Sequence, residues 1–440
     1  MEMNDMIIIS VDDHIIEPPD MFEKHLPAAY KDKAPKVVSK NGKDSWIYEG
    51  REMPNIALNA VVGRPPEEYG FEPVGYSQIR KGTYDVKARL DDMNADGILA
   101  QLTFPTMALF AGTAFLGSKD LTAAKAVISA YNDWSMDEWA DAAPGRFIKN
   151  AILPLWDIDA CVAEAKRVAK KGCHSISFPD CPAALKLPSI HTGYWDPLFK
   201  VMVENKMVVS AHIGSGNMAP HASMDAPIDV WITTMPMSIN VAAADWLFSD
   251  VFLRFPELKI SLAEGGVGWV PYMLERADFT YRHHRAWTHA NLGGLTPTER
   301  FHRNFITCFI EDKFGMQNTQ FLNLDHVCFE NDYPHSDCVW PNSPEILWEG
   351  VRQLPKETID KVTHLNAMRE YSFDPISILG RENCTVGALR AKAAAAGVDT
   401  VPKAGLGGLD PRKGTKERVT SGDIAKIFAK ALDAEANVEA

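Results

Sequence analysis

Seven acidic and imidazole side chains follow apolar runs of strand length. Each comes directly after its run or within one turn of it, and glycine or proline residues are nearby. Neutral imidazole and carboxylate oxygen are the ligands that divalent metals take where positions must stay open for substrate. One such cluster could be a solvated turn, but the pattern recurs at four places. It predicts a metal site built from Asp12, His14, Glu17, His212, Glu264, Asp332 and His335.

The site requires a fold that brings four strand ends together, and the alternation of strand-like and helix-like segments predicts one. Helical patterns such as Leu121 to Ala142 and Ile158 to Lys171 separate the apolar runs. Eight such units indicate an α/β protein, a (β/α)8 TIM barrel whose site lies at the carboxyl ends of its strands. The expected strands are 7–11, 98–104, 147–155, 173–178, 207–212, 258–263, 304–309 and 327–329.

Two segments do not follow the barrel pattern. Residues 20–97 form a long insertion after strand one, with a hairpin whose turn is Asn41-Gly42. Residues 373–440 form a C-terminal extension with helix-prone stretches at 385–396 and 421–440 around a Gly/Pro/Lys-rich loop. We therefore divide the chain into a barrel domain, 1–372, and an extension that wraps the barrel or a partner subunit.

Composition excludes several functions. The chain of 440 residues has a formal net charge of −13, with no basic block where phosphates would be neutralised, so we expect no nucleic-acid partner. The apolar run near the N-terminus is too short for a signal peptide or a membrane span, so we expect no membrane association. Seven scattered cysteines, an odd number, fit a reducing cytoplasm rather than a disulfide framework.

Five motifs together resemble the amidohydrolase superfamily, in the aminocarboxymuconate-semialdehyde decarboxylase-like group called amidohydrolase family 2. The resemblance covers residues 6 to about 372 and implies a metal-dependent barrel enzyme. Two departures are informative: the first-strand His-x-His is Asp12-x-His14 here, and Glu264 replaces a strand-six histidine. The motifs are Val11-Asp12-Asp13-His14, the His212 strand end, Glu264-Gly265-Gly266-Val267-Gly268-Trp269-Val270-Pro271, Asn331-Asp332-Tyr333-Pro334-His335 and Asn366-Ala367-Met368-Arg369-Glu370-Tyr371.

The interpretation that we favour is a non-haem dinuclear oxygenase. In it, two ions of iron or manganese, with O2, hydroxylate a small carboxylic or amino acid. The pattern is similar to a branch of the superfamily that includes a two-subunit hydroxylase of 2-aminoisobutyrate, which implies a homo- or hetero-oligomer with a related barrel subunit. The metal ligands would be His14, Glu17, His212, Glu264, Asp332 and His335.

Two other interpretations stay open. In one, Asp12, His14, His212 and Asp332 bind a single zinc or manganese for non-oxidative decarboxylation or hydrolysis of a small carboxylate. Glu264 or His335 would then act as acid or base. In the other, the chain is a non-catalytic partner of a related barrel. Across these interpretations the catalytic candidates are Glu264, His335 and Asp332, and the candidates for recognition of the substrate carboxylate are Arg64, Arg80 and Lys81.

Overall fold

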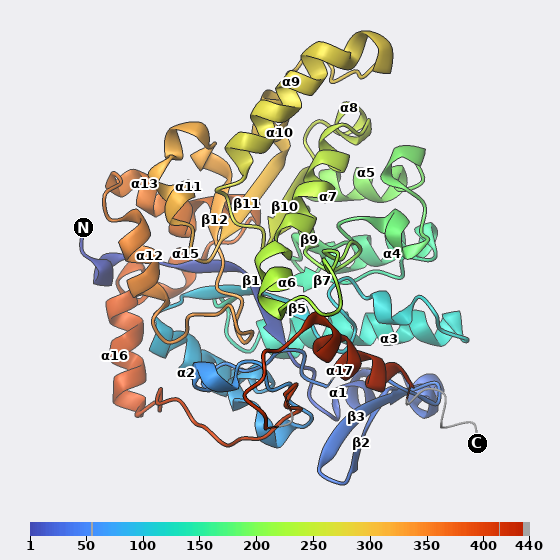
Figure 1. The fold of residues 1–440 in the computed structure, drawn as a ribbon, viewed down its shortest axis with the longest axis vertical. Coiled ribbons are helices and arrows are strands. Elements are labelled where there is room, and N and C mark those ends of the chain that lie inside the picture. The colour runs from blue at the N-terminus through green and yellow to red at the C-terminus, as the bar shows by residue number, and fades with distance from the viewer. Residues whose placement is uncertain (54–55, 413, 434–440) are drawn as a thin grey trace.

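The computed structural model describes residues 1–53, 56–412 and 414–433, and its centre is a closed parallel sheet (Figure 1). The hydrogen-bonded strand order is β6, β5, β1, β12, β11, β10, β9, β8 and β7. Only Lys149 separates β6 (Phe147–Ile148) from β7 (Asn150–Ala151), so both ends of this order belong to one strand position. Within the described residues the sheet therefore has eight parallel strand positions, and the predicted TIM barrel is confirmed.

The observed strands lie within or close to the predicted runs. The barrel strands are β1 (Ile9–Ile15), β5 (Ala100–Pro105), β6 (Phe147–Ile148), β7 (Asn150–Ala151), β8 (Ser175–Ser177), β9 (Val208–His212), β10 (Lys259–Ala263), β11 (Phe305–Phe309) and β12 (Val327–Phe329). The helices are α1 (Met21–His25), α2 (Val86–Asp96), α3 (Leu121–Asp133), α4 (Ile158–Ala169), α5 (Asp196–Glu204), α6 (Ile228–Thr234), α7 (Met237–Leu247), α8 (Val251–Arg254), α9 (Val270–Thr288), α10 (Pro297–Asn304), α11 (Lys313–Gln317), α12 (Ser343–Val351), α13 (Lys356–Asp360), α14 (Asn366–Glu370), α15 (Pro375–Leu379), α16 (Val386–Ala396) and α17 (Ser421–Asp433).

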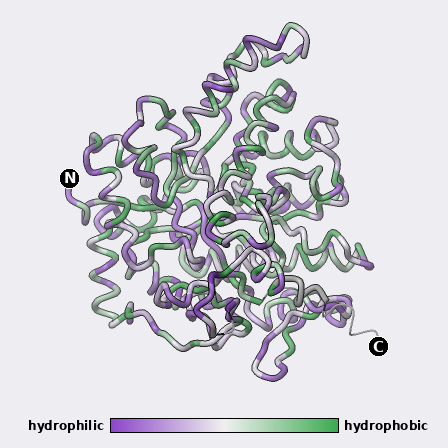
Figure 2. The backbone as a smooth tube through the Cα atoms, viewed as in Figure 1, coloured by the Kyte–Doolittle hydropathy of each residue, from purple (hydrophilic) through white to green (hydrophobic). Residues whose placement is uncertain are grey.

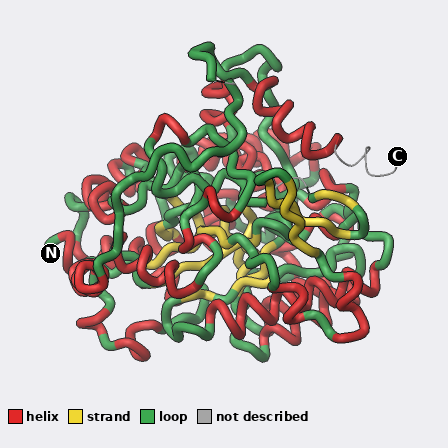
Figure 3. Tube along the Cα trace, turned by 90° about the horizontal axis from the view of Figure 1, so that it is seen from below, coloured by secondary structure: helices red, strands yellow, loops and turns green. Residues whose placement is uncertain are grey.

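The barrel strands are almost entirely buried because helices cover the outside of the sheet (Figure 3). All seven residues of β1 are buried. Inside the barrel, small polar side chains pair with one another, as in the 2.7 Å contact between Ser175 Oγ and Ser210 Oγ. Outside it, apolar side chains of the strands and helices form the core. Hydrophobic and hydrophilic residues alternate along the chain, as Figure 2 shows. The barrel is therefore a packed scaffold rather than a pore.

The segment between β1 and β5 contains both a small sheet and the first barrel helix. Strands β2 (Lys36–Lys40), β3 (Lys43–Tyr48) and β4 (Arg51–Glu52) form an antiparallel sheet, and the turn residues Asn41 and Gly42 have φ of 53° and 76°. Both values suit a tight hairpin turn, as the Asn-Gly pair predicts. Helix α2 lies inside the range 20–97, although it is the barrel helix that precedes β5.

The chain after α16 runs along this insertion, and α17 contacts α6. The Lys403 N–H donates to the Gly63 carbonyl at 2.8 Å, and the Ser421 N–H donates to the Ala226 carbonyl at 2.9 Å. The tail thus joins the insertion to the segment after β9. The domain boundaries and a contact with a partner subunit stay predictions, and residues 434–440 of the predicted last helix lie outside the described residues.

Arg89 of α2 is the buried cation that ties the insertion to the first strand. It donates to the Gly82 carbonyl at 2.6 Å, to Gln101 Oε1 at 2.9 Å and to the His14 carbonyl. Gln101 in turn donates to Asp13 at 2.7 Å. The Arg89 guanidinium also lies 4.2 Å from the centre of the Tyr333 ring. The end of β1 is therefore held by a network that begins on α2.

We expect Arg89→Met to lower the free energy of unfolding by about 3 kcal/mol, because it leaves buried acceptors and the Asp13 carboxylate uncompensated. Urea unfolding followed by circular dichroism measures the effect. Arg89→Lys keeps the charge and should lose less. An Arg89→Met variant as stable as the wild type would show that the network contributes nothing to the fold.

Candidate metal centre

Four predicted ligands converge at the carboxyl ends of β1, β9 and β12. His14 Nε2 lies 3.2 Å from His212 Nε2 and 3.2 Å from Asp332 Oδ1. Asp12 approaches both rings, at 3.6 Å from His14 Nε2 and 3.4 Å from His212 Nε2. Ligands of one ion with bonds of about 2.1 Å are separated by roughly 3.0 to 3.5 Å. Ligand spacing is therefore met in two groups that share His14, one with Asp12 and His212 and one with Asp332 and His335.

The hydrogen bonds of these side chains leave their ligand atoms free. His212 Nδ1 lies 2.6 Å from the Ile213 carbonyl, which requires Nδ1 to carry the proton and leaves the lone pair on Nε2. Both carboxylate oxygens of Asp12 are buried without a hydrogen-bond donor among the described residues, and the imidazoles of His14 and His335 are the groups that approach Asp332 Oδ1. Buried carboxylates without donors are costly unless a cation compensates them. The donor set therefore fits a divalent metal such as manganese or zinc.

Electrostatics support the same conclusion. Burial, followed by the negative charges of Glu330 and Asp332, raises the pKa of Asp12 well above its usual range. Burial would also raise the pKa of Asp332, but the neighbouring His335 and His14 hold it below the usual value. Burial lowers the pKa of His212 to about 4, so its ring is neutral at pH 7. A cation would favour the ionised form of Asp12 and complete the set.

Glu264 and His335 lie at the border of this cluster. Glu264 Oε2 is 3.2 Å from His212 Nε2, and its side chain is 10% exposed. His335 Nδ1 is 2.8 Å from Asp332 Oδ1, and the His335 ring stacks on His14 with centroids 3.9 Å apart. Glu264 and Asp332 have φ of 61° and 55°, an unusual conformation that turns each chain sharply at the strand end. Both strand ends are thus shaped to direct a carboxylate into the barrel mouth.

Glu17 is the one predicted ligand that the structure does not bring to the cluster. Its carboxylate accepts the Met107 N–H at 2.8 Å and the Ala108 N–H at 3.4 Å. Burial raises its pKa to about 7. The side chain therefore binds the backbone of the loop after β5 rather than facing the histidines.

Sequence reasoning missed Glu330, which stands at the end of β12 and is 1% exposed. Its Oε2 accepts the Glu264 N–H at 2.9 Å, and burial raises its pKa to about 8. It therefore fixes the backbone that carries Glu264. Its position directly after the apolar run Val327–Phe329 is the sequence signal that indicates a residue at a strand end.

The basic residues predicted to recognise the substrate are engaged elsewhere. Arg64 donates to the backbone carbonyls of Phe71, Gly407 and Gln78. Arg80 binds Asp92 through two hydrogen bonds, and Lys81 lies 3.4 Å from Asp85. We therefore find no support for a direct role of the three residues in carboxylate recognition.

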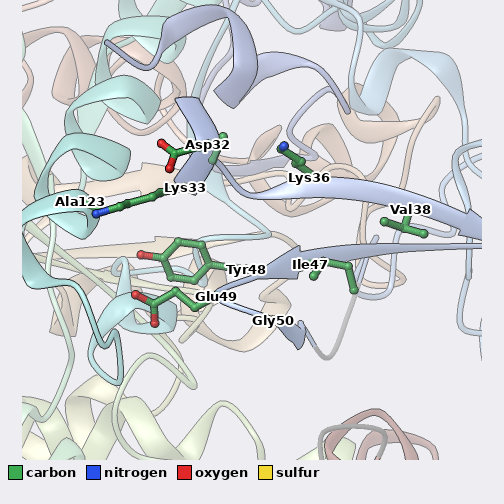
Figure 4. A pocket seen from close by; sticks show the side chains of 10 residues that line it. Asp32, Lys33, Lys36, Val38, Ile47, Tyr48, Glu49, Gly50 and Ala123 are labelled. Atoms are coloured by element: carbon green, nitrogen blue, oxygen red, sulfur yellow. The ribbon is translucent and has the colours of Figure 1, made fainter. Parts of the chain in front are cut away.

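A pocket of about 350 Å³ lies apart from the cluster, beside the β2–β3 hairpin and α3 (Figure 4). Its wall includes the half-buried or exposed side chains of Lys33, Lys36 and Glu49 together with the Tyr48 ring. Lys33 pairs with Asp120 at its border. The lining contains none of the predicted site residues, so we place the chemistry at the barrel mouth.

Comparison with known families agrees with the barrel and its strand-end motifs. A model of the amidohydrolase family matches residues 82–373, more than half of the chain. The chain belongs to the amidohydrolase family. The predicted membership is thereby confirmed, whereas the hydroxylase branch is not.

Individual relatives extend the match over most of the chain. A 2-amino-3-carboxymuconate-6-semialdehyde decarboxylase from Dictyostelium discoideum is 22% identical over 351 residues, 78% of this chain and 89% of that protein. An amidohydrolase from Mycobacterium avium subsp. paratuberculosis superposes with a TM-score of 0.64 and 20% identity, over 83% of this chain and 99% of the other. A 5-carboxyvanillate decarboxylase from Novosphingobium aromaticivorans, complexed with manganese, superposes with a TM-score of 0.58 and 16% identity. The match covers 84% of this chain and 99% of that protein.

These comparisons correct the favoured function. Apart from the amidohydrolase, whose name specifies no reaction, the proteins just described are named as decarboxylases. Our preference for a monooxygenase over a carboxy-lyase is therefore wrong. The placement of Glu17 agrees with the correction, because the dinuclear interpretation used its carboxylate as a ligand.

One finding about the helices bears on a membrane location, and the lack of membrane association stays a prediction. Among the described residues, every helix is too short or too polar to cross a bilayer. The cytoplasmic location stays a prediction.

Removal of one imidazole tests the centre directly. We expect His212→Ala to contain less than about one tenth of the wild-type metal, because an open site with few protein ligands loses most of its affinity with one of them. Elemental analysis of protein equilibrated with Mn²⁺ gives the content. His191→Ala removes an exposed imidazole that pairs with Asp245 and should bind metal as the wild type does. Equal metal in both variants would contradict the site.

Proposed function

We propose that this protein is a metal-dependent decarboxylase that releases CO2 from a small carboxylic acid without O2. The observation that carries the proposal is the buried cluster of Asp12, His14, His212 and Asp332 at the barrel mouth, where His14 lies 3.2 Å from Asp332 and His212 lies 3.4 Å from Asp12. His14 belongs to two groups with the spacing of metal ligands, one with Asp12 and His212 and one with Asp332 and His335. The decarboxylases among its relatives, one of them complexed with manganese, support this choice. A second ion and iron are not needed for it.

The proposed ligands each have a defined part. Asp12, His14, His212 and Asp332 would hold one divalent ion. When bound, the ion supplies positive charge that accepts electron density from the substrate as CO2 departs. These side chains lie at the carboxyl ends of the barrel strands, the end at which barrel enzymes bind substrate.

Decarboxylation breaks a carbon–carbon bond and leaves an electron pair on the substrate carbon, which must then take up one proton. Glu264 is the proton donor that we propose, because its carboxyl lies beside His212 and is partly open to the mouth. It can receive the replacement proton from solvent after each turnover. His335 is the second candidate, since its Nε2 is buried without a partner among the described residues while Nδ1 faces Asp332.

The activity is tested with anaerobic protein loaded with Mn²⁺ or Zn²⁺ and a panel of aromatic and unsaturated small acids. We expect metal-dependent CO2 release at the same rate with and without O2, and one deuterium in the product when the reaction runs in D2O. Oxygen uptake coupled to turnover would contradict the proposal. Metal-loaded protein inactive on every acid would favour the alternative of a non-catalytic partner subunit.

The proton donor is tested separately. We expect Glu264→Gln to lower kcat by about 10² or more while it keeps its metal, because general acid catalysis contributes on that scale. Steady-state kinetics and elemental analysis measure the two quantities. His335→Gln is the matched variant. A larger loss of kcat in His335→Gln than in Glu264→Gln would assign the proton transfer to His335.

A further inference from the structure

The loop after β5 places an aromatic ring on the metal centre. The Phe110 ring lies with its centroid 4.1 Å from that of His212 and 4.9 Å from that of His14. Phe104 of β5, which is fully buried, also packs against both histidines, with centroids 5.9 Å from His14 and 5.1 Å from His212. Phe110 is half-buried and follows the exposed Leu109. Phe110 therefore covers the side of the centre that faces the barrel mouth.

The backbone of this loop adopts a conformation that needs external support. Leu109 has φ of 56°, in the left-handed region that a leucine rarely occupies. Such a residue persists only where its neighbours hold the chain in place. The Ser177 hydroxyl donates to the Phe110 carbonyl and provides one support, immediately beside the ring.

The other support is the carboxylate of Glu17. It accepts the backbone N–H groups of Met107 and Ala108, the two residues just before Leu109. Glu17 is itself fixed, because it is fully buried and its carbonyl accepts the Tyr76 hydroxyl at 2.6 Å. Hydrogen bonds from N–H groups to a carboxylate are stronger than those to neutral acceptors. A single buried group at the end of β1 thus connects the ligand strand to the covering loop.

We propose that Glu17 is a positioning residue that anchors loop 106–112, so that Phe110 closes the mouth side of the metal centre. This inference rests on the metal centre of the proposed function. It assigns to Glu17 a role through Phe110 and none as a ligand. Metal and substrate then reach the centre by displacing one aromatic ring, and the strength of the anchor sets how often the ring moves aside.

The test uses three variants at pH 8, where the Glu17 carboxylate is ionised in the wild type. Glu17→Gln keeps the size but offers one oxygen instead of two, so we expect unchanged Mn²⁺ content with release to excess EDTA about tenfold faster. Amide hydrogen exchange at residues 106–112 should also quicken. Phe110→Ala should release Mn²⁺ faster but keep the slow exchange of Met107 and Ala108, because the anchor remains.

The control is Asp374→Asn, which alters a carboxylate that accepts the Ser377 N–H near the amino end of β6. It should match the wild type in release and in exchange at 106–112. Loss of Mn²⁺ in Glu17→Gln with unchanged loop exchange would make Glu17 a ligand and overturn the proposal. Unchanged release and exchange would overturn it as well. Both measurements work without substrate, so the role of Glu17 can be confirmed even if the protein has no decarboxylase activity. A wild-type protein that binds no metal would contradict both this proposal and the proposed function.

Discussion

The barrel mouth concentrates more buried negative charge than the protein alone can neutralise. Asp12, Glu330 and Asp332 are buried there beside Glu264, whose side chain is 10% exposed, and the repulsion among these carboxylates adds to the cost of burial. The imidazoles of His14 and His212 are neutral there, so they offer lone pairs rather than positive charge. A divalent cation resolves both features at once, because it compensates the carboxylates and uses the lone pairs.

The scaffold around this point is built to withstand that cost. Asp13, next to the ligand Asp12, is held by Gln101 and by the Tyr333 N–H. At the end of β12, the Ser343 N–H donates to Asp96 and its hydroxyl donates to Asn331, which fixes the segment just before Asp332. Apart from Asp13 Oδ2, the side-chain polar atoms of this network are buried and hydrogen-bonded, so they hold the ligand strands in place. The hydrogen bonds of the fold thus keep the carboxylates of the barrel mouth close together, although their charges repel one another.

The sequence predicted the barrel and the six residues at its mouth because both depend on local patterns. Apolar runs that end in His, Asp or Glu identify strand ends, and barrel closure then requires those ends to meet. The destination of Glu17 was not predictable, because it depends on the loop at 107–108, about ninety residues away. The reaction was not predictable either, since carboxylates and imidazoles serve oxygenases and decarboxylases alike.

The position of Glu17 is decided by a loop, whereas the positions of the other predicted ligands are decided by strands. Strand-borne ligands are fixed by the ladder, so their types and positions can be read from the chain. Glu17 stands one turn beyond such a ligand and has the same chemistry as Asp12, yet it serves the backbone of a loop that carries Phe110. In this barrel the strands determine which ion the mouth can hold, and the loops anchored to them determine what can reach it.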